Sequence, residues 1–500
     1  MIQTSRQSFI RQAAEFKTVP VTAELIADTL TPIQLFETFN KRAAFLLESR
    51  DPLSLWSEYS FIGIDPFLYL EEHNGRFEIR DHSERTLSSS TSFTTAWDQA
   101  AGYLNVSPIL PDLPFPGGAV GAFSFEAMSL TEDRVKKNSS TAASFVFCRT
   151  ILAFHHVKEE LTIIHFQEAG FDYELAYQEA VNQISCLTEQ LSGPAAPVGK
   201  RIFETEDEEA AEDPFEEVKS NISRDSFLEN VKRVKSYIES GDAFQVVLSQ
   251  RFEMDTPVNG LHIYRVLRKQ NPSPYMFYIR TEQEELIGSS PERLVKIESD
   301  RSIDIHPIAG TRKRGATEAE DREFEAELLA DEKEKAEHFM LVDLARNDLG
   351  RVCRYGSVET YEKLTVTRFS KVMHIISKVK GQLRDDVHPA EALLSAHPAG
   401  TVSGAPKIRA VEIIQELEKD TRGSYAGTVA YFGFNGTVDS CIAIRTIRLR
   451  SRKAYVQAGA GIVYDSVPEL EWEETRNKAS AMLAAVKQAK KSFEQEESVR

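Results

Sequence analysis

Cysteine is scarce in this sequence, and the four that occur lie far apart. Cys148, Cys186, Cys353 and Cys441 form neither a CxxC metal-binding pair nor the dense framework that holds small secreted domains together. Zinc-finger spacing and a disulfide scaffold are therefore excluded. We expect the four thiols to be reduced and buried as apolar side chains.

Long hydrophobic runs and an excess of positive charge are also missing. No apolar run approaches the roughly 18–20 residues of a membrane span, and the first residues lack the charged-then-apolar pattern of a secretory signal. With 59 Lys and Arg against 77 Asp and Glu, the net charge of −18 repels phosphate backbones and anionic membranes. We expect a cytoplasmic protein that binds neither nucleic acid nor membranes.

The 500 residues are 41% hydrophobic, which allows a large core in several folding units. A dense acidic run within residues 201–222 would repel itself inside a core, so it predicts a solvated linker. The linker divides the chain into an N-terminal region of residues 1–200 and a C-terminal domain of residues 223–490, followed by a tail of residues 491–500.

Strand-like stretches, rich in β-branched and aromatic residues, lie on both sides of the acidic run. They are residues 150–157, 161–166, 244–249, 275–279, 294–297, 428–432, 442–447 and 454–458. Helical stretches are expected at residues 32–48, 224–240, 318–347, 408–419 and 469–490. Because strands and helices follow one another without a strict strand–helix–strand alternation, the pattern favours an α+β fold over a doubly wound parallel sheet.

The sequence contains no complete glycine-rich nucleotide-binding loop. Residues 400–407 (GTVSGAPK) lack the spacing of a phosphate-binding loop, and Pro406 removes an N–H that such a loop needs. The Gly459–Gly461 stretch lacks the third glycine of a dinucleotide fingerprint. Its successive amides form either a tight turn or a small anion-binding nest.

Two pairs of carboxylates have a spacing that places each pair on one helix face. Glu334 and Glu337 are three residues apart, as are Glu471 and Glu474. Each pair alone is typical of a solvated helix face with neighbouring lysines. If the two pairs face each other across a cleft, they supply the hard oxygen ligands that Mg²⁺ prefers.

Several polar residues are set in apolar stretches. Arg445 within residues 442–447 faces either outward or a buried carboxylate partner, and Gln245 either faces solvent or lines a pocket. His374 is a lone histidine in an apolar run, which is more typical of a satisfied core residue than of a catalyst. Residues 306–315 (HPIAGTRKRG) predict a basic turn whose cations, Arg312, Lys313 and Arg314, either rim a substrate entrance or lie in solvent. These residues favour a pocket for an anionic substrate, although a ligand-sensing scaffold protein has the same signature.

Nine ordered sequence blocks spread along the chain resemble the chorismate-utilising enzymes, and within them the anthranilate synthase component I group. The blocks are residues 46–49 (LLES), 59–63 (YSFIG), 241–250 (GDAFQVVLSQ), 271–276 (NPSPYM), 288–292 (GSSPE), 307–311 (PIAGT), 337–350 (EHFMLVDLARNDLG), 400–407 (GTVSGAPK) and 457–461 (QAGAG). The resemblance implies two extended antiparallel β-sheets packed as a sandwich with helices outside, and an active site in the C-terminal part.

The resemblance also implies which residues bind the substrate. Glu337 and Glu474 are similar to Mg²⁺ ligands, supported by Glu334 and Glu471, and the metal would hold the ring carboxylate of chorismate. A second set of residues would bind the rest of the substrate. The enolpyruvyl carboxylate would be bound by Tyr425, Arg445 and the backbone of Gly459, Ala460 and Gly461. Lys478 would lie near the metal-bound carboxylate, and Thr311 and Thr401 would line the pocket with their hydroxyl groups.

The resemblance assigns the chemistry to a few further positions. Glu292 is similar to the general acid that protonates the departing C4 hydroxyl while a nucleophile adds at C2, and His374 would assist the loss of pyruvate. Water-adding relatives carry a lysine base at the position of Gln245, so the amide here favours ammonia as the nucleophile. Relatives that make 4-amino-4-deoxychorismate carry a lysine where this chain has Ala309. Nearly all these residues would also serve an enzyme that stops at 2-amino-2-deoxyisochorismate.

Partners and regulation follow from the same resemblance. No cysteine lies in a glutaminase-like nucleophile turn, so a separate glutamine amidotransferase subunit is expected to supply ammonia. The resemblance implies anthranilate formation as the first step of tryptophan biosynthesis, with feedback inhibition by tryptophan. The tryptophan-binding residues would be Leu47, Glu48 and Ser49, together with Asn271, Pro272, Ser273, Pro274, Tyr275 and Met276.

Overall fold

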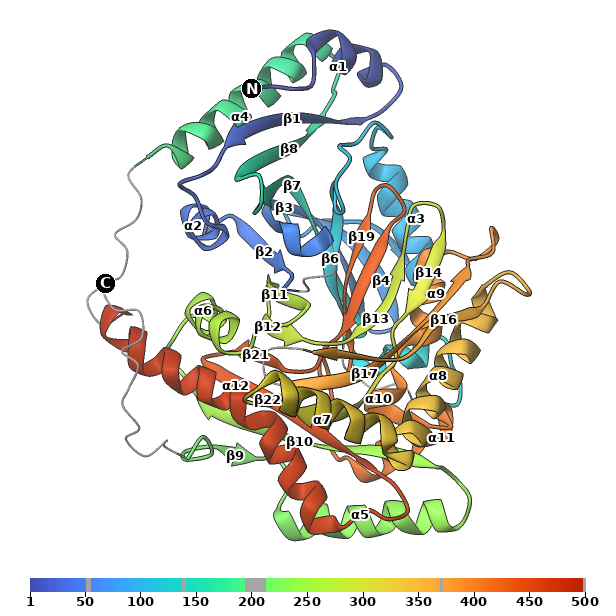
Figure 1. The fold of residues 1–500 in the computed structure, drawn as a ribbon. Helices are drawn as coiled ribbons and strands as arrows, with labels where there is room; N and C mark the ends of the chain where they lie inside the picture. Colours follow the sequence, from blue (N-terminus) through green and yellow to red (C-terminus); the bar gives the residue numbers. More distant parts are fainter. Residues whose placement is uncertain (51–54, 137–140, 194–212, 369–371, 498–500) are drawn as a thin grey trace.

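The computed structural model describes residues 1–50, 55–136, 141–193, 213–368 and 372–497 (Figure 1). Among these residues, 22 strands join in one antiparallel hydrogen-bonded network with helices around it. Across the described ranges, every helix is too short or too polar to cross a membrane.

Helices and strands alternate irregularly in both parts of the chain. The N-terminal elements are α1 (Arg6–Ala13), β1 (Thr18–Ile26), α2 (Pro32–Thr38), β2 (Ala43–Glu48), η1 (Leu55–Glu58), β3 (Tyr59–His73), β4 (Arg76–Asp81), β5 (Thr86–Ser90), α3 (Phe93–Leu104), β6 (Gly118–Phe123), η2 (Phe125–Leu130), β7 (Ala143–His155), β8 (Glu160–Glu168) and α4 (Tyr173–Leu191).

The C-terminal part contributes the remaining elements. They are β9 (Lys219–Ser220), α5 (Arg224–Glu239), β10 (Gln245–Asp255), α6 (Gly260–Gln270), β11 (Tyr275–Arg280), β12 (Glu285–Ser290), β13 (Arg293–Ile297), β14 (Ser302–Ile305), β15 (Ile308–Lys313), α7 (Glu318–Ala330), α8 (Glu332–Val352), β16 (Glu359–Arg368), β17 (Val372–Gln382), α9 (Pro389–Ala396), α10 (Gly400–Ser403), β18 (Gly404–Ala405), α11 (Lys407–Leu417), β19 (Thr428–Gly433), β20 (Val438–Ile442), β21 (Thr446–Arg450), β22 (Lys453–Ile462) and α12 (Pro468–Glu497).

The strand network consists of two long sheets that share β3 and β7. The first runs β1-β8-β7-β3-β2-β11-β12-β21-β22-β10, with β9 and β18 beside β10. The second runs β5-β4-β3-β7-β6-β19-β20-β13-β14-β17, with β15 and β16 beside β17. β3 changes sheet near Asp65, where φ is 58° and the pairing register with β7 shifts.

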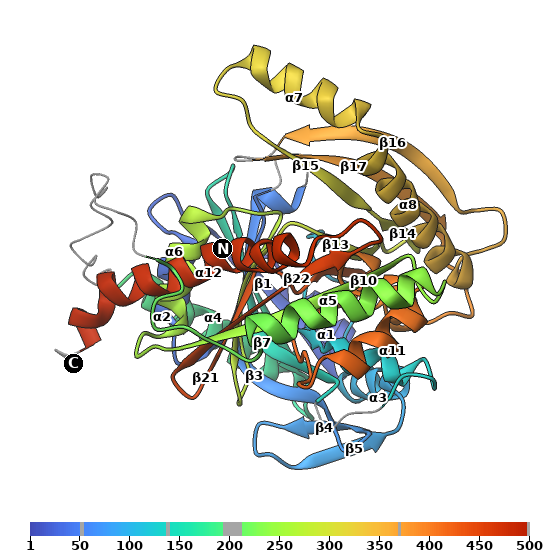
Figure 2. The same cartoon turned by 90° about the horizontal axis from the view of Figure 1, so that it is seen from below.

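Three apolar layers hold the two sheets and the helices together. Between the sheets, residues such as Phe61 and Phe277 of the first sheet pack with Val120, Val429 and Tyr431 of the second. The outer face of the first sheet packs against α1, α2, α4, α6 and α12, and that of the second against α3, α8, α9 and α11. α7 and α8 lie beside the end of the second sheet that is formed by β15, β16 and β17 (Figure 2). The predicted α+β fold, a sandwich of two extended antiparallel sheets with helices outside, is confirmed.

Local structure departs from the sequence-based predictions at several places. The helix predicted for residues 32–48 ends at Thr38, and the rest becomes β2, because this apolar segment pairs with β3 and β11. The helix predicted for residues 318–347 breaks at Asp331, whose side chain accepts hydrogen bonds from the first turn of α8. The basic segment is strand β15 rather than a turn. Three cysteines are buried, but Cys186 is exposed on α4.

Both parts of the chain contribute strands to each sheet. β2 pairs with β11 in the first sheet, and β6 pairs with β19 in the second. Residues 201–212 of the predicted linker lie outside the described residues, and β9, at the end of that segment, pairs with β10. α12 continues past residue 490 to Glu497, into the predicted tail. The division into an N-terminal region and a C-terminal domain stays a prediction.

Candidate functional site

The partly buried carboxyl group of Glu292 stands at the turn between β12 and β13. Thr401, in the short helix α10, donates a hydrogen bond from Oγ1 to Oε1 of Glu292 over 2.9 Å. Burial raises the pKa of Glu292 to about 7, although the hydrogen bond and the positive charges of Lys478 and Arg445 act in the opposite direction. Glu292 can therefore carry a proton near neutral pH and deliver it inside the protein.

Arg445 lies close enough to Glu292 for each to shift the pKa of the other. It is not inside a strand, as the sequence predicted, but at the bend between β20 and β21, where its φ is 48°. Its backbone carbonyl accepts a hydrogen bond from the Ser289 amide over 3.1 Å. Burial lowers the pKa of Arg445, as expected for a guanidinium that lacks a full carboxylate partner. This cation is placed to bind an anionic ligand beside Glu292.

The β10–β22 pair brings polar groups close to two glycines. A Cβ atom on Gly461 would lie 2.7 Å from Nε2 of Gln245, and one on Gly459 would lie 2.8 Å from Oη of Tyr425. Only glycine leaves room for these side chains. Gln245 is buried, which decides between its two predicted environments. Ala460 is fully buried with its side chain in the core, so only its backbone is available to a ligand.

The predicted acidic residues lie on α8 and α12. Nε2 of Gln245 donates to Oε1 of Glu337 over 3.2 Å. Nζ of Lys478 donates to Oε1 of Glu474 over 2.6 Å and to the Gly459 carbonyl over 3.1 Å. Burial is the main cause that raises the pKa of Glu471, and the negative charge of Glu474 adds to it. The two helices thus present carboxylates to the same region of β10 and β22.

These carboxylates match a hard divalent cation in chemical type. In the part of the chain that the structure describes, however, no three His, Cys, Asp or Glu side chains converge on one metal position. Two of the four predicted metal-binding carboxylates form ion pairs with basic side chains. Lys478 pairs with Glu474, and Arg312 pairs with Glu334 over 3.2 Å. The residues therefore fit the predicted metal ion in chemical type, although they do not converge on one position, and the metal site stays a prediction.

Thr311 and His374 face each other across the β15–β17 pair. Nδ1 of His374 lies 3.0 Å from both Oγ1 of Thr311 and the Gly310 carbonyl oxygen. Burial lowers the pKa of His374, and Arg445 also lowers it. Because Nδ1 of a neutral ring donates to the carbonyl, Nε2 is the nitrogen that can accept a proton.

The three cations of residues 306–315 have structural partners. Arg312 forms ion pairs with Glu327 and Asp331 over 2.8 Å each, in addition to Glu334. Arg314 pairs with Asp321, and Lys313 lies over the Phe324 ring. These contacts of residues 312–314 hold β15 against α7 and α8.

Arg422 is a buried arginine that the sequence analysis missed. Its guanidinium donates to the carbonyl oxygens of Val402 and Val247 over 2.7 Å each, and it pairs with Glu418 over 2.7 Å. Val402 adjoins Thr401, and Val247 lies in β10 two residues after Gln245. Arg422 therefore holds two parts of the candidate site at a fixed separation. Its context, Lys-Asp-Thr-Arg-Gly-Ser, is typical of a solvated loop, so the sequence carried no signal for this role.

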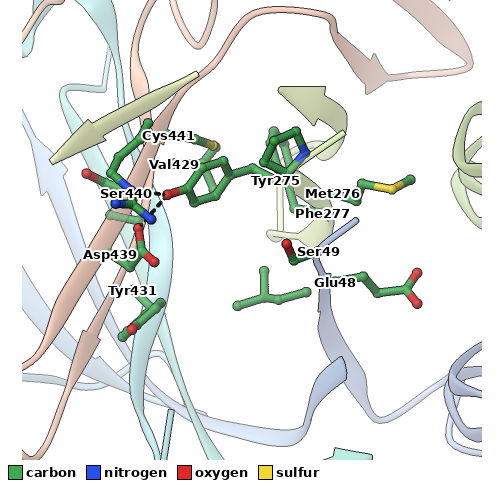
Figure 3. Close-up of a pocket in the computed structure, with 14 residues that line it drawn as sticks. Glu48, Ser49, Tyr275, Met276, Phe277, Val429, Tyr431, Asp439, Ser440 and Cys441 are labelled. Atoms are coloured by element: carbon green, nitrogen blue, oxygen red, sulfur yellow. Dashed lines mark hydrogen bonds between the residues drawn. The ribbon is translucent and has the colours of Figure 1, made fainter. Parts of the chain in front are cut away.

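Two cavities flank the site. One is lined by Glu292 and Thr401 together with apolar residues of α8, including Leu341 and Leu344. The other lies between the two sheets (Figure 3).

The cavity between the sheets is where several of the predicted tryptophan-binding residues meet. Its lining includes Leu47, Glu48, Ser49, Pro274, Tyr275 and Met276, but not Asn271, Pro272 or Ser273. Glu48 points away from the cavity (Figure 3), and its carboxylate is bound by Arg268, Tyr264 and Ser60. The Glu48 carboxylate therefore already has its partners and does not face the cavity.

The opposite wall of this cavity comes from residues that the sequence analysis missed. It consists of Arg293, Val429, Ala430, Tyr431, Asp439, Ser440 and Cys441, while Phe277 of β11 lines the cavity beside Met276. Tyr275 reaches across to this wall (Figure 3), since its hydroxyl donates to Asp439 over 2.9 Å and accepts from Arg293 over 2.7 Å. The charged Asp439 within the apolar stretch of residues 438–442 was the signal that could have identified the wall.

The chain matches a family described as chorismate binding enzyme over residues 65–484. It is 47% identical to anthranilate synthase component 1 of Geobacillus stearothermophilus and 42% identical to that of Bacillus subtilis; these alignments cover 98% and 99% of this chain, and 98% and 97% of the relatives. The crystal structure of anthranilate synthase component I from Streptococcus pneumoniae superposes with a TM-score of 0.71 at 34% identity, covering 86% of this chain and 93% of that one.

A more distant structure shares the fold. The menaquinone-specific isochorismate synthase from Escherichia coli superposes with a TM-score of 0.68 at 18% identity, covering 96% of this chain and 98% of that one.

Proposed function

The chain belongs to the chorismate-binding enzyme family, and on this premise we propose that it is the aminating subunit of an anthranilate synthase. In this proposal ammonia replaces the C4 hydroxyl of chorismate by adding at C2, and elimination of pyruvate then gives anthranilate for tryptophan biosynthesis. The observation that carries the proposal is Glu292, a partly buried acid with a pKa of about 7 beside two cations.

The first step needs an acid, because hydroxide is a poor leaving group. Glu292 gives its proton to the C4 hydroxyl, which departs as water while the nitrogen lone pair forms the bond to C2. The new C2 ammonium loses one proton, which restores the acid. Arg445 binds the enolpyruvyl carboxylate, and Thr401 holds the Glu292 carboxyl group in position through its hydrogen bond.

Ammonia is the nucleophile that this arrangement suits. The Gln245 amide cannot remove a proton from water, whereas ammonia brings its own lone pair. In the structure this amide is oriented by Glu337, to which it donates a hydrogen bond. Ala309 carries no amine that could attack the ring, which argues against the synthesis of 4-amino-4-deoxychorismate.

The second step removes pyruvate from the aminated ring. A base takes the C2 proton, the C3–O bond breaks, and the enolpyruvyl methylene gains a proton, so that pyruvate leaves and the ring becomes aromatic. His374 fits the role of the base, because its lowered pKa keeps the ring neutral and its Nδ1 is held by the Gly310 carbonyl.

A magnesium ion completes the proposal. Glu337 and Glu474 would hold it, with Glu334 and Glu471 beside them, and when bound it would fix and neutralise the ring carboxylate of chorismate. Lys478, which lies between Glu474 and the Gly459 carbonyl, adds a positive charge on the same side.

We expect the purified chain to form anthranilate and pyruvate in equal amounts from chorismate, Mg²⁺ and an ammonium salt at mildly alkaline pH. The physical reason is that free ammonia can substitute for ammonia released by a partner subunit. Anthranilate fluorescence and a pyruvate assay measure the two products, and a chelator should abolish both until Mg²⁺ is restored.

The outcomes separate the alternatives. An aminated product without pyruvate would identify a 2-amino-2-deoxyisochorismate synthase. Formation of 4-amino-4-deoxychorismate would identify a 4-amino-4-deoxychorismate synthase. No turnover with any nucleophile would favour a ligand-sensing scaffold protein.

We also propose that the cavity between the sheets binds tryptophan as a feedback inhibitor. Its wall is continuous with the candidate active site, because Arg293 follows Glu292 and the Ile442 amide donates to the Glu292 carbonyl over 3.0 Å. A ligand that moves β13 or β20 would therefore displace the acid. Such a ligand binds one state of the site better than the other and thereby shifts the equilibrium between them.

Replacing Val429 by Phe should weaken tryptophan inhibition by roughly tenfold or more, since a lost pocket of this kind reaches hot-spot magnitude. Val429 lines the cavity and is buried, so the larger ring occupies the space of the ligand. The measurement is ammonium-dependent anthranilate formation against tryptophan concentration. Val429→Ala, which enlarges the cavity, is the control and should remain inhibited. Unchanged inhibition of the Phe variant would move the tryptophan site elsewhere.

A further inference from the structure

A third cavity lies between the sheets near the end of β11, and we call it the arginine cavity. The first sheet lines it with Ile279 of β11, Leu286 of β12 and Arg448 of β21, and the second sheet with Ala122 of β6. Its lining shares no residue with the two cavities that flank the candidate site. The arginine cavity is therefore a separate space, and the amination of chorismate leaves it without a role.

Two arginines of β21 point into the arginine cavity. Ile447 and Leu449 pack in the apolar layer on the outer face of the first sheet. Strand alternation therefore turns Arg448 and Arg450 toward the second sheet, and both line the cavity. The Arg448 guanidinium lies over the Tyr455 ring at 4.7 Å. Stacking of this kind holds the planar group in place and leaves its N–H donors available.

The described residues supply little negative charge to these two cations. Nε of Arg448 lies 3.7 Å from Oε2 of Glu284, beyond hydrogen-bond distance. Burial raises the pKa of Glu284, and Arg448 and Arg450 both act against that rise, so both cations lie near this one carboxylate. The other carboxylate of the lining, Glu71, is already paired with Arg80. Among the described residues, the guanidinium groups of Arg448 and Arg450 form no hydrogen bond.

Ser124 adds a buried hydroxyl group to the lining. Its side chain is 7% exposed, and its Oγ has no hydrogen-bond partner within the described ranges. Ser124 stands at the N-cap position of η2, but its side chain does not cap that helix. A buried hydroxyl without a partner is costly, and a bound group that accepts hydrogen bonds would satisfy it.

The loop before β19 separates the arginine cavity from the candidate active site. Thr421, Gly423 and Ser424 line the cavity. A Cβ atom on Gly423 would lie 3.2 Å from Nη1 of Arg448, so the loop packs directly against this guanidinium. Arg422, between these residues, holds the Val402 and Val247 carbonyls on the other side. A molecule in the arginine cavity would therefore contact the loop that supports the active site.

We propose that the arginine cavity binds a small molecule through a phosphate or carboxylate group. Guanidinium groups bind both kinds of oxyanion through paired N–H donors, and Arg448 and Arg450 present such donors together. The Ser124 hydroxyl adds a further donor. Because the net charge of −18 repels anions elsewhere on the chain, binding depends on this local pair of cations.

The test is calorimetric titration of the full chain with pyrophosphate and, separately, with citrate, in buffer without Mg²⁺. We expect one of the two anions to bind at one site per chain. Arg448→Gln should lower the affinity on the order of tenfold or more, because it loses charge-assisted hydrogen bonds. Glu284→Gln removes the nearest negative charge and should raise the affinity by up to about fivefold, the range of a partly screened charge pair.

A control variant and a second measurement locate the bound anion. Arg445→Gln removes the guanidinium of the candidate active site and should leave the affinity for the anion unchanged. Hydrogen exchange should slow at residues 281–284 and 421–424 when the anion is added, because these two segments line the arginine cavity. Tighter binding of pyrophosphate would identify a phosphate-bearing ligand, and tighter binding of citrate a carboxylate-bearing one.

Two outcomes contradict the proposal outright. One is that neither anion binds at millimolar concentration, and the other is that Arg448→Gln binds as tightly as the wild type. Loss of binding in Arg445→Gln alone would assign the anion to the candidate active site and equally reject the arginine cavity. If Arg448→Gln folds poorly, Arg450→Gln gives the same comparison at an exposed position. None of these measurements depends on the proposed amination.

Discussion

A Glu292→Gln variant should form anthranilate on the order of 10²- to 10⁴-fold more slowly than the wild type, because it loses the general acid. The same variant should be more stable at alkaline pH. The folded pKa of about 7 exceeds the ordinary value of 4.5. The folded chain therefore binds this proton more tightly than the unfolded chain does.

The direction of the stability effect, and the pH range in which it occurs, follow from the difference between the folded and the ordinary pKa of Glu292. Stability from the protonated Glu292 is complete below about pH 4.5 and is lost as the pH rises through about 7. Above this range, burial of the ionised carboxylate destabilises the wild type by an amount on the order of 3 kcal/mol. Glutamine is neutral throughout, so the variant should match the wild type near pH 4.5 and exceed it near pH 8.5 in denaturant unfolding.

Glu284 offers a matched control for both effects. Burial raises the pKa of its carboxyl group as well, with Arg448 and Arg450 acting against it, and it lies outside the candidate site. Glu284→Gln should therefore gain stability at alkaline pH without losing activity. Full activity in Glu292→Gln would exclude Glu292 as the acid, and a pH-independent difference in stability would contradict the raised pKa.

An Arg422→Met variant should lose about 3–5 kcal/mol of stability, the cost of breaking a buried ion pair from one side. The Arg422 side chain is 1% exposed and that of Glu418 is 11% exposed. Without the guanidinium, this carboxylate loses its opposite charge and keeps only the Ser249 donors, and the carbonyl oxygens of Val402 and Val247 lose the guanidinium donor. The shift in the unfolding midpoint measures the loss, and the ammonium-dependent rate should fall with it because Thr401 and Gln245 are no longer held together.

Arg409 provides the comparison for this variant. It forms ion pairs with Asp242 and Glu412, but its side chain is 32% exposed, so solvent screens them. Arg409→Met should cost less than about 1 kcal/mol. Equal effects of the two substitutions would show that burial does not determine how much these ion pairs contribute to the free energy of unfolding. A second substitution, Glu418→Leu in Arg422→Met, should restore part of the stability.

Local patterns in the sequence predicted much of the fold and parts of the site. β-branched runs identified β10, β11, β13, β19 and β22 of the C-terminal part but missed others, such as β12, β16 and β17. The polar Gln245 and the two carboxylate pairs pointed to a pocket. The Ala43–Glu48 segment was mistaken for helix, because its strand form depends on pairing with β11, more than 200 residues later. No local pattern carries that information.

The parts of the site that depend on long-range contacts could not be predicted from the residues alone. Arg445 was placed in a strand, whereas its positive φ arises at a bend where β20 leaves one sheet and β21 enters the other. Similarly, the far wall of the cavity between the sheets comes mostly from β19 and β20, which are distant in sequence from the residues opposite. The family resemblance supplied the role of Arg445, and the structure supplied its neighbours and the residues of the far wall.

The exchange of β3 and β7 between the two sheets has a consequence for how the chain is made on the ribosome. When residues 1–193 have emerged, β2 and β6 each still lack a neighbour, because β11 and β19 have not been synthesised. Open strand edges of this kind pair readily with other chains. The first sheet and the second must therefore both wait for the C-terminal half, so the nascent N-terminal half is the part most in need of a chaperone.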